Sequence, residues 1–78
     1  MIPKITFEER NWLKEYSRRV RSRMEDLGIN QSRLAELTGL DNGTIHNMYY
    51  GKRIPLVTNA IKVARALAMD PADLIDIA

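Results

Sequence analysis

The segment NQSRLAELTGLDNGTIHNMYYG, from Asn30 to Gly51, decides the fold that we expect for this chain. Its first part, Gln31–Leu37, favours a helix, and Gly39 can end that helix because glycine tolerates the left-handed conformation. Asp41 can then cap a second helix, since its carboxylate can accept the unpaired backbone N–H groups at a helix start. The segment therefore predicts two short helices joined by a tight turn.

The second of these helices has a narrow buried edge and an otherwise polar surface. Ile45 and Met48 are three residues apart, which places them on one side of a helix. Gly51 follows the last residues of the pattern and can end the helix. A polar helix after a glycine-containing turn has the arrangement of a helix-turn-helix motif, whose second helix can enter the major groove of DNA.

A longer helix is predicted before this segment. Thr6 and Glu9 have the spacing of a capping box, and Gly28 can end the helix. Steps of three and four residues relate the apolar positions of its buried stripe, which are Leu13, Tyr16, Val20, Met24 and Leu27. Residues 1–5 precede it as a loose arm. Phe7 and Trp12 lie in its first turns and either contact another chain or, as we slightly prefer, fold back over the last helix.

Two more helices are expected after the segment. Pro55 prevents a helix from continuing through its position. A fourth helix is predicted from Val57 to Ala68, with an inner face made of Ile61, Ala64, Leu67 and Ala68. Asp70 followed by Pro71 is a strong start signal for a short fifth helix, in which Leu74, Ile75 and Ile77 are apolar.

The length and composition limit the possible functions. The 78 residues include no cysteine and fit one all-α domain, residues 1–78, that is too small to enclose a catalytic cavity. We expect no enzyme, because no paired carboxylates, nucleophile with a base, or phosphate-binding glycine loop is present. With a single histidine we expect no metal site, and nothing implies a cofactor. No apolar run approaches the roughly 20 residues of a membrane span, so we expect a cytoplasmic protein.

The charges are distributed unevenly along the chain. Residues 10–65 carry eleven Lys and Arg against five Asp and Glu, whereas residues 66–78 carry three Asp and no base. No acidic residue lies between Asp41 and Asp70. A segment without negative charge around a polar helix suits a polyanionic partner. The alternative is that the basic residues only solvate helix faces.

From Asn30 to Leu74 the sequence resembles the phage-repressor and Cro type of helix-turn-helix domain, and with the first helix the resemblance covers about residues 16–76. It implies a compact five-helix bundle of the lambda-repressor type that binds double-stranded operator DNA, usually as a homodimer, and acts as a transcriptional repressor or regulator in a bacterium or phage. The residues that carry the resemblance are Leu27, Gly28, Gln31, Leu34, Ala35, Gly39, Thr44, Ile45, Gly51, Lys52, Arg53, Pro55, Ala64, Leu67, Asp73 and Leu74.

The resemblance also implies which residues touch DNA. Bases are contacted from the start and the next turn of the second short helix, at Asn42, Gly43, Thr44, His46 and Asn47. Asparagine suits this role, because its amide can donate to N7 and accept from the N6 amine of adenine. Thr44 has an alternative role in capping with Asp41, and His46 can instead be solvated. Phosphates are contacted by Asn30, Gln31, Lys52 and Arg53, the first two at a helix N-terminus.

The sequence departs from the family pattern at a pair of positions. Many members join an arginine late in the first helix to a glutamate late in the recognition helix, and here Met24 and Tyr49 stand at those positions. We therefore expect an apolar contact there and one positive group fewer on the DNA-binding face.

Apolar residues near the C-terminal helices have two possible roles. The family's polar cap before the fourth helix is replaced by Leu56 and Val57. The residues in question, which either form a dimer contact or close the core of the monomer, are Ile54, Leu56, Val57, Leu74, Ile75 and Ile77. Phe7, Trp12 and the apolar tail of the chain, residues 74–77, also support a rival function, a protein-interaction module on the same scaffold, such as an antitoxin or antirepressor partner.

Overall fold

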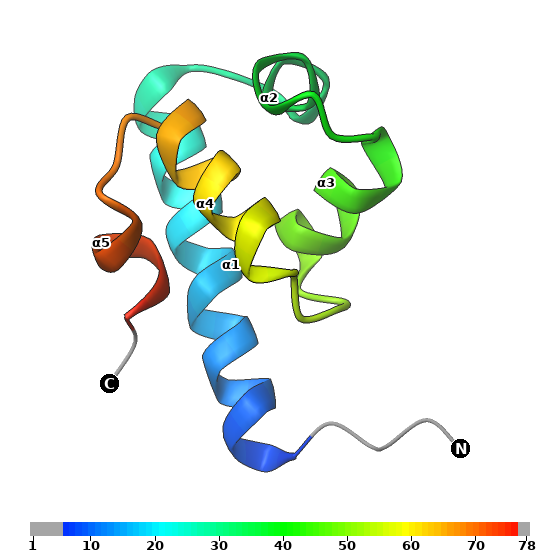
Figure 1. Ribbon diagram of the computed structural model, residues 1–78, viewed down its shortest axis with the longest axis vertical. Coiled ribbons are helices and arrows are strands. Elements are labelled where there is room, and N and C mark those ends of the chain that lie inside the picture. Colours follow the sequence, from blue (N-terminus) through cyan, green and yellow to red (C-terminus); the bar gives the residue numbers. More distant parts are fainter. Residues whose placement is uncertain (1–5, 77–78) are drawn as a thin grey trace.

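The computed structural model describes residues 6–76, which form five helices and no strand. The helices are α1 (Phe7–Leu27), α2 (Gln31–Thr38), α3 (Asn42–Tyr50), α4 (Val57–Ala66) and α5 (Pro71–Ile75), as Figure 1 shows. The predicted all-α, five-helix fold is therefore confirmed. The N-terminal arm and Ile77 lie outside the described residues.

The helix starts follow the capping residues of the sequence. Thr6 and Glu9 form the expected capping box, in which the Thr6 hydroxyl accepts from the Glu9 N–H and the Glu9 carboxylate accepts from the Thr6 N–H. Asp70 caps α5, which begins at Pro71. The predicted boundaries are thus right within about one residue, except at the end of α4.

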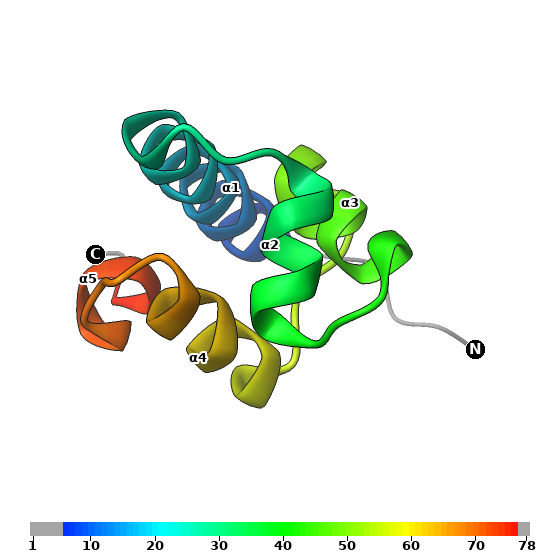
Figure 2. The same cartoon turned by 90° about the horizontal axis from the view of Figure 1, so that it is seen from above.

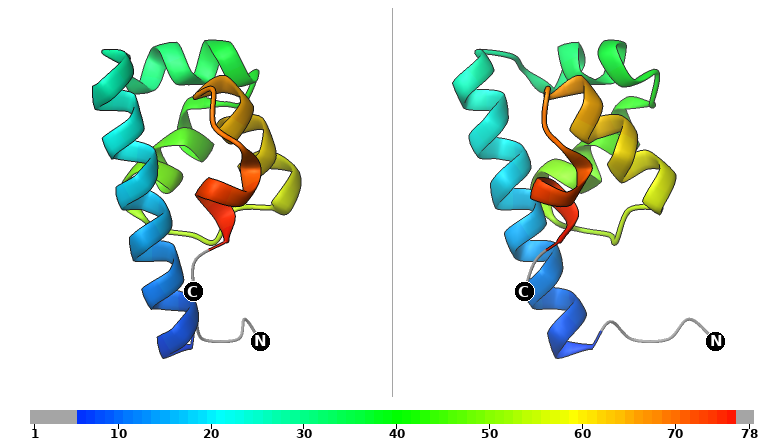
Figure 3. Two further views of the ribbon diagram at one scale, coloured as in Figure 1. Left: turned by 90° about the vertical axis from the view of Figure 1, so that its left-hand side faces the viewer. Right: turned by 60° about the vertical axis from the view of Figure 1, so that its left-hand side comes forward.

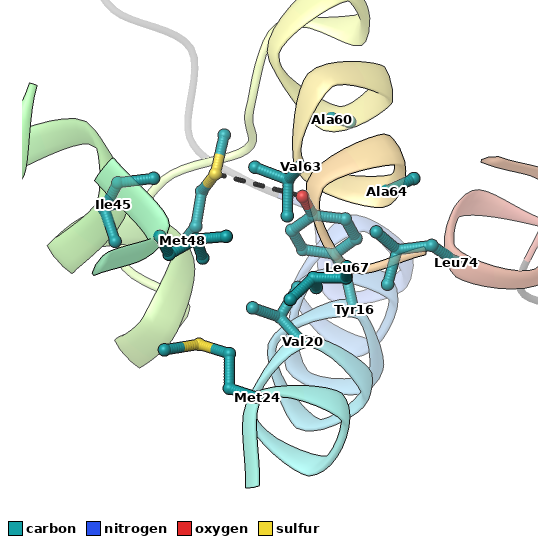
Figure 4. Close-up of a cluster of buried hydrophobic side chains, with 11 residues drawn as sticks. Tyr16, Val20, Met24, Ile45, Met48, Ala60, Val63, Ala64, Leu67 and Leu74 are labelled. Carbon is teal, nitrogen blue, oxygen red and sulfur yellow. Dashed lines mark hydrogen bonds between the residues drawn. The ribbon is translucent and has the colours of Figure 1, made fainter. Parts of the chain in front are cut away.

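The core lies where α1 meets the other helices. Tyr16 on α1 is buried, its phenol lies 3.9 Å from the sulfur of Met48, and burial raises the pKa of that phenol (Figure 4). A buried hydroxyl with only a sulfur partner is weakly satisfied, so apolar packing dominates here. The buried apolar cluster consists of Tyr16, Val20, Met24, Leu34, Ile45, Met48, Ala60, Val63, Ala64, Leu67 and Leu74.

Two details of the predicted core are wrong. Leu27 is exposed, so the buried stripe of α1 ends at Met24. The inner face of α4 is formed by Ala60, Val63, Ala64 and Leu67, whereas Ile61 is only half-buried and Ala68 is exposed. Helix α4 ends at Ala66, and Ala68 has a left-handed conformation with a φ of 55°. The predicted end of α4 is therefore two residues too late, because the left-handed residue after its C-cap is an alanine and not a glycine.

The aromatic residues of the first turns of α1 behave differently from each other. The ring of Trp12 stacks on Tyr16 with 5.1 Å between centroids, and its Nε1–H donates to the Ile75 carbonyl over 3.0 Å. Trp12 therefore folds back over the last helix, as we preferred. Phe7 is 78% exposed, so the same prediction is wrong for Phe7, and the first turns of α1 project beyond the other helices (Figure 3).

Arginines of α1 join it to the C-terminal ends of three other helices. The side chain of Arg19 donates to the Asp73 carbonyl, that of Arg21 to the Tyr49 carbonyl, and that of Arg23 to the Leu67 carbonyl. The last carbonyls of a helix have no partner within it and carry the negative end of its dipole, so cations are favoured there. These arginines therefore position α3, α4 and α5 on α1.

Candidate nucleic-acid interface

Helices α2 and α3 form the predicted pair at one end of the molecule. They pack against each other, and each also contacts a second helix, α4 in the case of α2 and α1 in the case of α3 (Figure 2). The turn between them begins at Gly39, whose φ of 73° is accessible to glycine at little cost. Only Leu34 of α2 and Ile45 and Met48 of α3 are fully buried. Most of the surface of α3 therefore remains available to a ligand.

The start of α3 is fixed by its N-cap. The carboxylate of Asp41 accepts from the Thr44 N–H over 3.0 Å and from the Thr44 hydroxyl. These hydrogen bonds lower the pKa of Asp41, the Thr44 hydroxyl contributing most. Since the hydroxyl proton of Thr44 is donated to Asp41, its oxygen can only accept from a ligand. A side chain at position 43 would approach the carboxylate, because a Cβ on Gly43 would lie 3.0 Å from its Oδ2.

The residues predicted to contact bases lie together along α3. Asn42, Gly43 and His46 are exposed, and Thr44 and Asn47 are half-buried. Ile45, which lies among them in sequence, points into the core. Asn42, Gly43 and His46 are thus open to a ligand, whereas Thr44 and Asn47 are partly covered and line a depression with residues of the segment that follows α3.

The C-terminal half of α3 carries a cluster that the sequence did not suggest. The ammonium of Lys52 lies 3.2 Å from the Nε2 of His46 and 5.9 Å from the centroid of the Tyr50 ring. The His46 and Tyr50 rings are 4.7 Å apart. Because an ammonium has no lone pair, Lys52 must donate and the Nε2 of His46 must accept. His46, which is predicted to contact bases, is thus linked to Lys52, which is predicted to contact a phosphate.

The start of α2 lies beside α1 and the end of α3. Asn30 is the N-cap of α2, and its side-chain oxygen accepts from the Arg33 N–H over 2.8 Å. Its amide nitrogen has no hydrogen-bond acceptor in the described part of the chain and can donate to an anion. Asn30 and Gln31 line a depression of about 480 Å³ together with Arg21 and Tyr49.

An arginine lies beside this depression although Met24 occupies the position where many family members carry one. Met24 is buried in the core and Tyr49 packs against that core, which agrees with an apolar contact in place of an ion pair. Arg21, one turn before Met24, nevertheless brings its guanidinium within 2.7 Å of the Tyr49 carbonyl and 5.9 Å of the Tyr49 ring centroid. The family pattern did not indicate Arg21, because this arginine approaches Tyr49 from a different turn of α1 than Met24 does.

The segment between α3 and α4 presents the remaining predicted phosphate contacts. Lys52 and Arg53 are both exposed. Arg53 lines a small depression of about 210 Å³ together with Thr44, Asn47 and Asn59. The outer side of α3 is therefore bordered by the start of α2 on one side and by residues 52 and 53 on the other.

The residues predicted for a dimer contact are only partly available. Ile54, Leu56 and Val57 are 41%, 70% and 69% exposed. Ile75 is half-buried and lines an apolar groove of about 300 Å³ that also includes Ile54 and Val57. The assignment of Leu74 is wrong, because its side chain is completely buried in the monomer core.

The fold and the exposed polar helix define the class of helix-turn-helix DNA-binding domains. Within this class, the sequence model of the Cro/C1-type HTH DNA-binding domain matches residues 19–78, and the chain belongs to that family. No curated protein and no solved structure gave a significant match. None of the helices within residues 6–76 combines the length and the apolar character that crossing a membrane requires.

Proposed function

We propose that the protein is a sequence-specific transcriptional regulator that binds a pseudo-palindromic operator as a homodimer and acts as a repressor. The observation that carries the proposal is the exposed surface of α3, which belongs to a Cro/C1-type domain and lies in a segment, residues 42–69, without any acidic residue. No acidic side chain of that segment opposes the approach of phosphates, and the carboxylate of Asp41, beside the start of α3, is engaged in the helix cap. Repression then follows when the bound dimer blocks access of the polymerase.

The proposed contacts fall into two groups. Asn42 and Asn47 select bases through their amides, while Thr44 accepts hydrogen bonds from base amines. Gly43 allows close approach, and His46 contributes from the next turn. The contacts that fix the register on the phosphates are assigned to Asn30, Gln31, Lys52 and Arg53.

Selection of bound oligonucleotides from a random pool tests the function directly. The expected product is a site with two-fold symmetry whose half-sites are about 34 Å apart, which is one turn of DNA. Alanine at Asn42 or Asn47 should relax the preference at one base pair by about 1–3 kcal/mol. Alanine at Gln31 should weaken binding to all sequences alike and reduce its salt dependence. An unchanged ratio of operator to random binding in the asparagine variants would refute their assignment.

The dimer contact is proposed for the exposed apolar residues before and at the start of α4. Ile54, Leu56 and Val57 lie beside the apolar groove that Ile75 also lines, and their burial by a second copy removes apolar surface from water. Leu56→Asp should therefore lower affinity for a full operator more than for a single half-site. Equal losses on both DNA molecules would contradict this position of the contact.

The same apolar groove supports a second candidate, binding of a different protein. Its walls include Trp12 and Pro55, and its lining is mostly apolar. A stoichiometric protein partner together with no salt-sensitive binding to DNA would favour an interaction module over a regulator.

A further inference from the structure

Another depression lies between the N-terminal half of α1 and the C-terminal end of α3, and we call it the α1–α3 groove. It measures about 510 Å³, and its lining includes Arg10, Lys14, Arg21 and Tyr50. Three of its lining side chains are basic and none is acidic. The groove therefore has the charge that an anionic ligand requires.

This groove involves a part of the chain that the family match does not include. The match begins at residue 19, whereas α1 begins at Phe7. Arg10 and Lys14 lie in the additional turns, which project beyond the other helices (Figure 3). Membership of the family thus gives these two residues no role.

Arg10 and Lys14 are available for a ligand. Both are exposed, and neither side chain has a hydrogen bond or an ion pair with any of residues 6–76. The four arginines at positions 18, 19, 21 and 23, in contrast, each bind a carboxylate or a carbonyl within the domain. The densest basic cluster of the sequence is therefore largely structural, and the cations of α1 without such a partner among residues 6–76 lie before it.

The groove is continuous with the proposed operator-binding surface. Arg21 lines both this groove and the depression beside Gln31. Steps of four and seven residues separate Arg10, Lys14 and Arg21, so the three lie on one side of α1. They extend over roughly 16 Å of helix axis, at 1.5 Å per residue. At its other edge, the Tyr50 ring contacts the predicted phosphate ligand Lys52.

We propose that the α1–α3 groove binds the DNA phosphate backbone that flanks each half-site, with Arg10 and Lys14 as the ligands of two phosphates. A guanidinium can bind two phosphate oxygens at once, and an ammonium acts as a point charge. This inference rests on the proposed function, because it extends the same DNA interface beyond the bases that α3 contacts.

The test compares Arg10→Gln/Lys14→Gln with the unchanged protein on two duplexes. One duplex is trimmed to the selected operator, and the other carries one further helical turn on each side. Each phosphate contact contributes about 0.9 to the slope of log K against log salt concentration. On the long duplex the magnitude of this slope should be smaller by about 1.8 for the variant than for the unchanged protein. Raising the salt from about 50 to 200 mM should therefore reduce the DNA affinity of the variant by a factor roughly tenfold smaller than that of the unchanged protein. On the trimmed duplex the two proteins should behave alike.

The variant Lys62→Gln/Arg65→Gln is the matched control. It removes the same charge from exposed positions on α4, which lies across the molecule from the junction of α1 and α3 (Figure 2). It should leave the slope unchanged on both duplexes. An equal effect of both double variants would show a general influence of net charge and overturn the proposal.

Two further outcomes separate this inference from the proposed function. If the unchanged protein shows no salt-sensitive binding to DNA, the proposed function fails and the inference with it. If Gln31→Ala weakens binding while Arg10→Gln/Lys14→Gln does not, the operator-binding function stands and the α1–α3 groove is not a phosphate site. Equal losses of affinity of Arg10→Gln/Lys14→Gln for the two duplexes also overturn the proposal, since they place the contact inside the half-site.

Discussion

Replacing Gly51 by alanine tests how α3 is held against α1. Gly51 ends α3 with a φ of 65°, and a Cβ at this position would lie 2.8 Å from the Oγ of Ser17. A left-handed alanine costs about 1–2 kcal/mol, and overpacking of a tight contact adds about 1–3 kcal/mol. We therefore expect Gly51→Ala to lose about 2–5 kcal/mol of the free energy of unfolding, a large share for a domain of this size.

Gly28→Ala is the control that measures the cost of the left-handed backbone conformation alone. Gly28 ends α1 with a φ of 66°, and a Cβ there would meet nothing within 4 Å. The free energy of unfolding of this variant should fall by only about 1–2 kcal/mol, which is the cost of a left-handed alanine. Unfolding in urea, followed by circular dichroism, gives both values. Equal losses in the two variants would show that the contact with Ser17 has no energetic effect.

Ser17→Ala should relieve the overlap. The next nearest atom of Ser17, its Cβ, lies 3.5 Å from the position of the new methyl group, which is an ordinary van der Waals contact. The Ser17 hydroxyl is buried without a partner among residues 6–76, so its removal alone should stabilise the protein by about 1 kcal/mol. Gly51→Ala/Ser17→Ala should then be no less stable than Gly28→Ala. A double variant as unstable as Gly51→Ala would refute the reasoning.

Three further predictions concern other parts of the fold. Trp12→Phe keeps an aromatic ring but removes the hydrogen bond to the Ile75 carbonyl, so it should cost about 1 kcal/mol and speed amide exchange in α5. Hydrogen bonds from two arginines lower the pKa of Glu15 from 4.5 to about 2, so the stability that its ionised form contributes is present above pH 4.5 and is lost as the pH falls towards 2. Glu15→Gln should therefore make unfolding less dependent on pH in that interval, as acid titrations at fixed urea can measure. Asn30→Ala should destabilise the protein by about 1 kcal/mol through loss of the α2 cap, and Asn30→Ser should restore most of it in thermal unfolding.

The elements that could be predicted from the sequence are those with local causes. The starts of α1, α3 and α5 depend on Thr6, Asp41 and Asp70, whose side chains accept from N–H groups two or three residues later. The buried edge of α3 follows from the spacing of Ile45 and Met48. Residues close together in the sequence determine these features, so short segments of the sequence are sufficient to predict them.

The features that the sequence did not show depend on distant parts of the chain. The four arginines at positions 18, 19, 21 and 23 form a dense basic cluster in the sequence, and three of them donate to carbonyls at the ends of other helices. Every residue has a backbone carbonyl, so no spacing in the sequence identifies these partners. The close approach of Gly51 to Ser17 is likewise a consequence of how α3 crosses α1.

Helix α3, the proposed recognition helix, owes its position to contacts at its two ends. A helix of nine residues is not stable alone, and α3 buries only Ile45 and Met48. The Asp41 cap fixes its start, while the bond from Arg21 to the Tyr49 carbonyl and the approach of Gly51 to α1 fix its end. Because these contacts hold the helix from its ends and its inner edge, most of its outer surface is free to carry polar residues. Changes in α1 that touch no base can therefore alter the orientation of α3 and, through it, the proposed recognition of DNA.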